Sequence, residues 1–306
     1  MQSQVLLLLP ALVQMQADHS AWLFRHRKTL KPLKPLVLVL FCAAQASAQT
    51  PHPLPSELKV ATVNIAIGAV TAGVWRAVTR RPILPGAARG AAAGAAIFAG
   101  RRIVTKAQPG YWWLGREMAA IASSEIANAA QDRPILERAI IPVGPIRIHV
   151  DRAAKRKVQP KFDIVSAIVA GVVATRDGTS FALKESLATG TLVFLAPETS
   201  DELGQSVAGV MTISDLVPDG TFPGLQSKRR VMSHELIHTT QQDFVFNGWS
   251  DPAQTAIASK NPMIRGLTRY VDFNLTLPVQ VIANSLIEYH NRPWEKEAKA
   301  IAQRTP

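Results

Sequence analysis

Residues 231–244 constrain this chain more than any other stretch, because they contain His234-Glu235-Leu236-Ile237-His238. Residues four apart lie one turn apart on the same face of an α-helix. His234 and His238 can therefore direct two imidazole nitrogens at one metal ion. Glu235 lies about 100° further round, where it reaches a zinc-activated water without being a ligand and takes its proton. The pattern predicts metal-assisted hydrolysis on a helix spanning about 227–244, with Zn²⁺ as the metal.

Composition limits the class of protein. The chain has 306 residues, 47% of them hydrophobic and 18% charged, enough for one large or two small folded domains. Its net charge is +12. Residues 1–48 hold five basic groups and one acidic group, so the remainder carries 29 − 21 = +8. The basic residues are not interleaved with aromatic ones, so no nucleic-acid partner is predicted.

Residues 1–48 have the pattern of a signal peptide. A basic stretch at 25–34 precedes a short apolar run at 36–44, and Ala46-Ser47-Ala48 has the small residues of a cleavage site. This predicts a secreted protein, exported to the periplasm or the extracellular space. Cys42 is the only cysteine and lies within the leader, so we expect no disulfide and no cysteine ligand in the exported chain.

Residues 49–135 are expected to form a helical region rich in glycine and alanine. Residues 60–75 carry no charge, and Gly86, Gly90 and Gly94 recur every four residues. Small residues at that spacing leave a bare groove on one helix face, so two backbones can pack closely. We expect a two-helix hairpin at 57–106 and a third helix at 113–130. The hairpin is poor in the large apolar residues of a membrane span. This favours a soluble or peripherally membrane-bound hairpin over the alternative, a membrane-spanning one.

Residues 136–306 are expected to form an α+β domain. The apolar run at 162–174 can be a strand or a helix, and its β-branched residues favour a strand. Strands are predicted at 146–150, 191–195 and 207–214. The last of these precedes the motif helix and is a candidate edge for pairing an extended peptide. A polar connection is expected at 247–262. A final helix is expected to begin at Pro293, because Arg292 precedes a proline and Glu295 suits a first helical turn.

Two histidines do not complete a catalytic zinc site, so a third ligand must come from elsewhere. The adamalysin-like pattern requires a glycine and a third histidine after the motif, but Gln241 and Phe244 occupy those positions. The other main option is a glutamate on a later helix, and Glu295-Lys296-Glu297-Ala298 has the pattern Glu-x-x-Ala. With the histidine motif, this pattern resembles the gluzincins, the thermolysin-like group of zinc metallopeptidases. The resemblance is confined to the C-terminal part of the chain.

The resemblance implies a zincin-like fold, in which a small mixed sheet precedes an active-site helix and a C-terminal ligand helix. It also implies that His234, His238 and Glu295 bind zinc, that Glu235 is the general base, and that the small Ala298 lets the two helices approach. Glu297 and Glu288 remain alternative third ligands. Lys299 stands where the familiar enzymes often have an aspartate that supports a ligand histidine, so that support is not expected here.

Other polar residues near the two motifs have weaker assignments. Tyr289, His290 and Arg292 are candidate donors to the tetrahedral intermediate of peptide hydrolysis. Gln241 lies on the ligand face of the motif helix, where it can contact substrate or stabilise the site. Asp243 projects to roughly the opposite side of that helix.

The leading hypothesis is an exported zinc metalloprotease that hydrolyses a peptide or protein substrate. Its domains would be a leader at 1–48, a helical hairpin region at 49–135 and a zincin-like domain at 136–306. The alternative is a non-enzymatic envelope protein with a structural or vestigial zinc site, in which residues 57–106 mediate assembly or peripheral membrane contact. The complete motif argues against this alternative, because a structural zinc site does not need Glu235.

Overall fold

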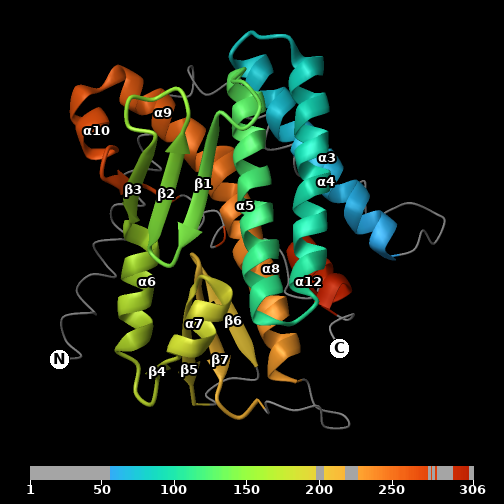
Figure 1. The fold of residues 1–306 in the computed structure, drawn as a ribbon, viewed down its shortest axis with the longest axis vertical. Coiled ribbons are helices and arrows are strands. Elements are labelled where there is room, and N and C mark those ends of the chain that lie inside the picture. Colours follow the sequence, from blue (N-terminus) through green and yellow to red (C-terminus); the bar gives the residue numbers. More distant parts are fainter. Residues whose placement is uncertain are drawn as a thin grey trace, which may run out of the picture. The chain divides into compact units, whose positions relative to one another are not determined.

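The computed structural model describes residues 56–197, 203–217, 227–274, 277, 280 and 292–302. These residues form an α+β fold, as the sequence predicts, with helices on the N-terminal side of the chain and two small sheets after them (Figure 1). The leader at 1–48 with Cys42, and the candidate site residues Glu288, Tyr289 and His290, lie outside the described residues. The proposed boundaries at 48 and 135 remain predictions.

The helical hairpin predicted at 57–106 is confirmed. It consists of α3 (Ser56–Val78) and α4 (Ile83–Val104), which lie antiparallel in close contact (Figure 1). A Cβ atom on Gly68 would lie 2.2 Å from the carbonyl oxygen of Gly90, so only glycine fits at this crossing. The third helix, α5 (Pro109–Gln131), begins four residues earlier than predicted, with Pro109 in its first turn.

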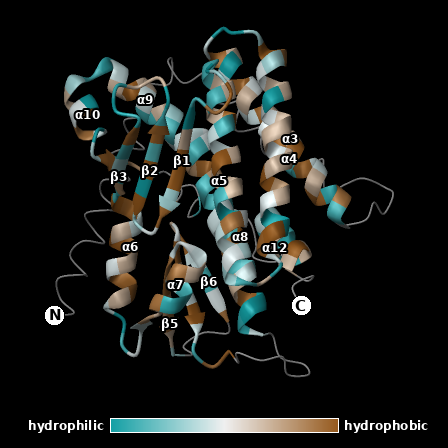
Figure 2. Ribbon diagram, viewed as in Figure 1, coloured by the Kyte–Doolittle hydropathy of each residue, from teal (hydrophilic) through white to brown (hydrophobic). Residues whose placement is uncertain are grey.

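The hairpin is apolar along much of its length (Figure 2). It also carries buried polar side chains, among them Asn64, Arg76 and Arg101. Both α3 and α4 are long and apolar enough to cross a membrane, a property they share with buried helices of soluble proteins. Arg76 of α3 donates its Nε hydrogen to the carbonyl oxygen of Ala129 at 2.7 Å, and its guanidinium pairs with Asp132. Membrane contact through 57–106 therefore stays a prediction.

The first sheet follows α5. Its strands are β1 (Arg138–Val143), β2 (Ile146–Asp151), β3 (Val158–Asp163) and β8 (Val271–Asp272), in that spatial order. The first three are antiparallel neighbours, and β8 pairs parallel to β3. The strand predicted at 146–150 is β2 and is confirmed.

The second sheet lies beside the motif helix. It contains β4 (Ser180–Phe181), β5 (Leu192–Ala196), β6 (Gly204–Val207) and β7 (Val210–Ser214), in the spatial order β4-β5-β7-β6. The strand predicted at 191–195 corresponds to β5. A short helix, α7 (Leu183–Thr189), connects β4 to β5. The sheet is mixed, because β5 and β7 are parallel while β4 and β6 pair antiparallel to their neighbours.

The strand predicted at 207–214 is confirmed only over Val210–Ser214, which is β7. The chain reverses at Ala208 and Gly209, whose φ angles are +50° and +77°, and these two residues form the turn of a hairpin. A two-residue turn with positive φ angles matches the twist of antiparallel strands. As a result β7 lies inside the sheet, and β6 is one of its two edge strands, with β4 at the other edge.

The preference for a strand at 162–174 is wrong, and the helical alternative holds for most of the segment. Only Phe162 and Asp163 belong to β3, and residues Ile164–Ala174 form helix α6. The side chain of Asp163 accepts a hydrogen bond from the backbone N–H of Ser166 at 3.1 Å and so caps the helix. This local cap, together with burial of Val173 against the second sheet, outweighs the β-branched composition of the segment.

The motif helix is α8 (Lys228–Val245), close to its predicted span. It continues without a break through a π-helical turn (Phe246–Ser250) into α9 (Asp251–Lys260), and α10 (Pro262–Leu267) follows. The polar connection predicted at 247–262 is therefore wrong. The reason is tertiary: Phe246 is fully buried, and Asn247 donates a hydrogen bond to the carbonyl oxygen of Ala120 on α5.

The main core packs the second sheet against α8 and α12 (Pro293–Ala302). The fully buried side chains of this core come from all three elements and include Val193, Met211, Ile213, Leu236, Ile237 and Ala298. Helix α5 contacts α8 as well. The motif helix is thus fixed by a sheet, by α5 and by the final helix.

Candidate metal centre

Helix α8 presents His234 and His238 on one face, one turn apart. The helix begins at a Ser227 cap, whose side-chain oxygen accepts a hydrogen bond from the N–H of Arg230 at 3.3 Å. Helix α12 begins at Pro293, and its first turn carries Glu295. Ala298, predicted to let the two helices approach, is fully buried in the core that α8 and α12 share.

His234, His238 and Glu295 converge. The two Nε2 atoms lie 3.1 Å apart, Oε1 of Glu295 lies 3.2 Å from Nε2 of His238, and Oε2 lies 3.6 Å from Nε2 of His234. Ligand atoms placed 2.0–2.1 Å from a tetrahedral zinc ion are separated by roughly 3.3 Å. The three residues therefore fit a common metal ion, and this group could hold one.

The electrostatics of this group favour a cation. Burial by itself lowers the pKa of His238, but the hydrogen bond to Glu295 and the charges of Glu235 and Glu295 outweigh burial and raise it above its usual value. For Glu295 burial acts to raise the pKa, but the two histidines outweigh it and the pKa lies far below its usual range. Oε2 of Glu295 is buried and makes no hydrogen bond within the described part of the chain. An ionised carboxylate with a free buried oxygen suits a metal ligand.

Gln241 fixes the orientation of His238. Its amide nitrogen donates to the carbonyl oxygen of Trp294 at 3.2 Å and to Oε2 of Glu297 at 2.9 Å. Its amide oxygen is therefore left as the acceptor for Nδ1–H of His238, 2.8 Å away. With Nδ1 protonated, the lone pair of His238 is on Nε2, which faces His234 and Glu295. The aspartate that the familiar enzymes often have in place of Lys299 hydrogen-bonds a ligand histidine. Here Gln241 makes such a hydrogen bond, to His238.

Glu297 contacts no histidine in the described structure. Its Oε1 atom accepts hydrogen bonds from Arg101 of α4 at 2.5 Å and from Asn64 of α3 at 2.7 Å. Arg101 and Asn64 were not predicted as site residues. In the sequence Arg101 is indistinguishable from its neighbour Arg102 at the end of a helix rich in small residues, and nothing pairs it with Glu297.

Glu235 lies on the side of α8 that faces the second sheet. It is 5% exposed. A Cβ atom on Gly204, the first residue of β6, would lie 2.9 Å from Cγ and 3.1 Å from Oε1 of Glu235. The glycine therefore leaves the space that the Glu235 side chain occupies beside the edge strand.

Asp243 faces away from the metal centre, as predicted. It lies 3.3 Å from Arg147 of β2 and 3.6 Å from Arg116 of α5, and all three side chains are buried. Arg147 also bonds Asp163, the capping residue of α6. Arg292, the remaining candidate donor, lies at the start of α12, where its carbonyl oxygen accepts a hydrogen bond from the N–H of Lys296.

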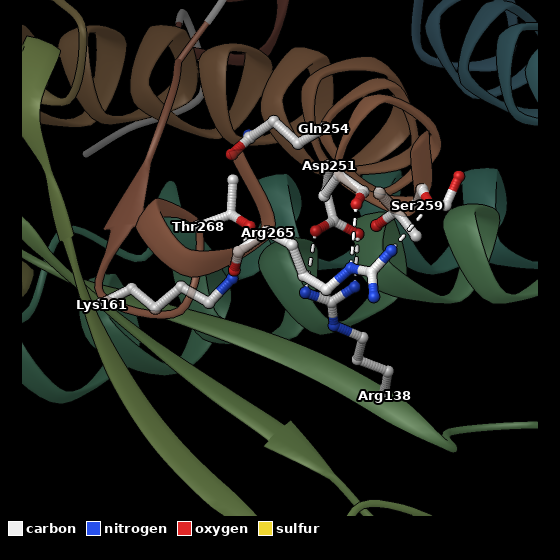
Figure 3. Close-up of a pocket in the computed structure, with 9 residues that line it drawn as sticks. Arg138, Lys161, Asp251, Gln254, Ser259, Arg265 and Thr268 are labelled. Atoms are coloured by element: carbon white, nitrogen blue, oxygen red, sulfur yellow. Dashed lines mark hydrogen bonds and ion pairs between the residues drawn. The ribbon is translucent and has the colours of Figure 1, made fainter. Parts of the chain in front are cut away.

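A separate hollow lies between the first sheet and helices α9 and α10 (Figure 3). Arg138 pairs there with Asp251 at 2.8 Å, and Lys161 points into the hollow. Arg265 bonds the carbonyl oxygens of Ala258 and Ser259 near the end of α9. None of the residues that line this hollow belongs to the His234–His238–Glu295 group.

Comparison with known protein families, curated proteins and solved structures finds no match to this chain. The functional assignment therefore depends on the chemistry and geometry of the described residues.

Proposed function

We propose that this protein is a zinc-dependent metallopeptidase of the gluzincin type. One observation carries the proposal: Glu295, on a helix far along the chain, brings its carboxylate to the two histidines of the motif helix. A buried glutamate next to the first histidine is what hydrolysis requires and a structural metal site does not. Packing of a small mixed sheet on α8 supports a zincin-like fold.

In this proposal His234, His238 and Glu295 hold the zinc ion. A zinc ion held there would supply the Lewis acidity that polarises a scissile carbonyl and lowers the pKa of a nearby water. The Glu235 carboxylate accepts the proton of the attacking water and then delivers it to the nitrogen of the leaving amine. Gln241 holds Nδ1–H of His238, so the ring keeps its orientation during turnover.

The edge strand β6 offers a place for an extended peptide substrate. The carbonyl oxygen of Ser206, in the middle of β6, already accepts a hydrogen bond from the Gln242 side chain at 2.9 Å. Peptide pairing is therefore directed to the Gly204 end of the strand, which is the end beside Glu235. This placement brings a substrate backbone close to the general base. The peptide-pairing edge is therefore proposed at β6, in place of the 207–214 segment expected from the sequence.

The proposed setting is outside the cytoplasm, because residues 25–48 have the pattern of an export signal. The substrate is a peptide or protein, and the apolar hairpin allows peripheral association with a membrane. We propose no nucleic-acid partner.

Replacing Glu235 by Gln tests the function. The variant should retain zinc, because the three ligands are unchanged, and should lose hydrolysis by about 10²–10⁴-fold, as expected when a general base is removed. The assay measures new amino termini released from denatured casein, together with zinc content. Lys296→Gln, at an exposed position on α12, is the control. Wild-type activity in Glu235→Gln would contradict the mechanism, and a wild-type protein that neither binds zinc nor cleaves casein would contradict the function.

A further inference from the structure

We propose that the helical hairpin is part of the metal centre, and that Arg101 of α4 is a positioning residue that orders the metal ligands through Glu297 and Gln241. This inference rests on the metal site of the proposed function. It assigns a role to the 57–106 region that the histidine motif alone does not explain.

Arg101 connects three helices around one buried guanidinium. Its side chain is 4% exposed. It donates to Oδ1 of Asn64 on α3 at 2.7 Å, to Oγ1 of Thr240 on α8 at 2.9 Å and to Oε1 of Glu297 on α12 at 2.5 Å. A guanidinium presents several donors in a fixed planar arrangement, so these contacts fix the relative positions of the three partners.

Glu297 passes this constraint on to Gln241. One carboxylate oxygen accepts from Arg101 and from Asn64, while the other accepts from the Gln241 amide at 2.9 Å. Both oxygens are thus used, one on the hairpin and one on α8. A carboxylate held on both sides cannot rotate without breaking a charge-assisted hydrogen bond.

Gln241 completes the connection to the metal ligand, because its amide oxygen accepts from Nδ1 of His238 at 2.8 Å. Three successive contacts therefore join Arg101 to a metal ligand. Glu297 also lies only two residues after Glu295, near the start of α12. The same contact that orders Gln241 therefore holds the helix that supplies the third ligand.

The neighbouring residue shows that this arrangement differs from an ordinary ion pair. Arg102 also pairs with a glutamate, Glu57 of α3, at 2.8 Å, but both side chains are about one-third exposed. Arg101 and Glu297 are 4% and 14% exposed. Removing water from two charges is costly, and an apolar pair would fill such a position at least as well for stability alone. A role for this buried ion pair in orienting Glu297, and through Glu297 the Gln241 side chain at the metal ligand, explains why the position is polar.

The test compares metal affinity in Arg101→Gln, Gln241→Met and the double variant, with Arg102→Gln as the matched control. Zinc affinity is measured by competition with a chelator, and ligand geometry by the absorption spectrum of the cobalt-substituted protein. Each single variant should bind zinc 10–100-fold more weakly, the range typical when a residue that supports a ligand is lost. The loss of zinc affinity in the double variant should be little larger than in the weaker-binding single variant. Arg101 acts on the metal ligand through Gln241, so the two effects are not independent. Arg102→Gln should match wild type.

Three results would overturn the inference. They are wild-type zinc affinity in folded Arg101→Gln, wild-type affinity in Gln241→Met, or losses in the double variant that multiply. If Arg101→Gln does not fold, Arg101→Lys keeps the charge opposite Glu297 and should show an intermediate loss, while Gln241→Met gives an independent readout at a partly exposed position.

The same measurements separate this inference from the proposed function. A wild-type protein that binds no zinc would contradict both. A wild-type protein that binds zinc and cleaves casein, with Arg101 and Gln241 variants that bind zinc equally well, would contradict the positioning role alone.

Discussion

The carboxylate of Glu295 lies 3.2 Å from Nε2 of His238, although the two residues belong to different helices far apart in the sequence. Helix α12 reaches this position because its apolar face, including Ala298 and Ile301, packs in the same core as Leu236 of α8. The third ligand is therefore placed by hydrophobic packing of the final helix on the motif helix. Changes at Glu295 should affect metal binding without removing this core.

Glu295→Gln should weaken zinc binding by more than the 10–100-fold typical of a supporting residue, because it replaces an ionised ligand by a neutral amide. The fold should be retained, since the amide has nearly the shape of the carboxylate. Zinc affinity by chelator competition and thermal unfolding of the metal-free protein check both statements. Equal zinc affinity in wild type and Glu295→Gln would remove Glu295 from the ligand set.

Gly204→Ala should lower kcat while leaving zinc affinity near its wild-type value. The new methyl group would lie 2.9 Å from Cγ of Glu235 and 2.8 Å from a methyl group of Val231, so the Glu235 side chain must move. General base catalysis contributes about 10²–10⁴-fold to the rate, and a misplaced base loses part of this factor. The metal ligands are unchanged.

The control for this prediction is Gly171→Ala on α6, where a Cβ atom would have no neighbour within 4 Å. Steady-state kinetics and zinc affinity are measured for both variants. A loss of zinc affinity in Gly204→Ala as large as its loss of kcat would show that the strand positions the ligands as well as the base.

Gly68→Ala should destabilise the hairpin. Its Cβ atom would lie 2.2 Å from the carbonyl oxygen of Gly90, a contact with backbone that neither helix can relieve by a side-chain rotation. Overpacking of this kind costs about 1–3 kcal/mol or more. Chemical denaturation of the metal-free protein measures the loss. Gly110→Ala at the start of α5, where a Cβ atom meets nothing within 4 Å, should be neutral or slightly stabilising.

Glu117 of α5 makes stability depend on pH. Burial raises its pKa from 4.5 to about 7, with Arg116 opposing the shift and Asp243 adding to it. Neither of its carboxylate oxygens has a hydrogen-bond partner among the residues that the structure describes. Because the folded state holds the proton more tightly than the unfolded chain, this group's contribution is fully favourable below about pH 4.5 and is lost as pH rises to about 7.

Glu117→Gln should remove this dependence, since the amide has similar shape and cannot ionise. Relative to wild type, the variant should gain on the order of 3 kcal/mol of unfolding free energy between pH 4 and pH 8. Denaturant unfolding of both metal-free proteins across this range measures the difference. A difference that stays constant with pH would show that Glu117 is ionised at neutral pH.

Local features of the sequence predicted several elements correctly. The recurrence of Gly86, Gly90 and Gly94 predicted a closely packed hairpin, and Pro293 marked the start of the final helix. These predictions depend on interactions within a few residues or along one helix face. The spacing of His234 and His238 similarly determines that two ring nitrogens share a face once a helix forms.

Sequence patterns failed where contacts from elsewhere in the chain compete with local preference. The β-branched segment Ile164–Ala174 became a helix once Asp163 capped it, and the polar residues after 245 continued the motif helix because Asn247 bonds α5. The reversal at Ala208 and Gly209 ended one strand at Val207 and began another at Val210, and this made β6 an edge strand of the sheet.

The sequence by itself determined the two histidines, the adjacent glutamate and a short set of carboxylates for the third position. Tertiary structure decided how those carboxylates divide: Glu295 faces the histidines, and Glu297 faces Arg101. The difference arises because residues two apart on a helix point in directions about 200° apart. Packing of α12 on α8 turns Glu295 towards the histidines and leaves Glu297 between Gln241 of α8 and Arg101 of the hairpin. Only the folded chain could bring Arg101 to that second carboxylate.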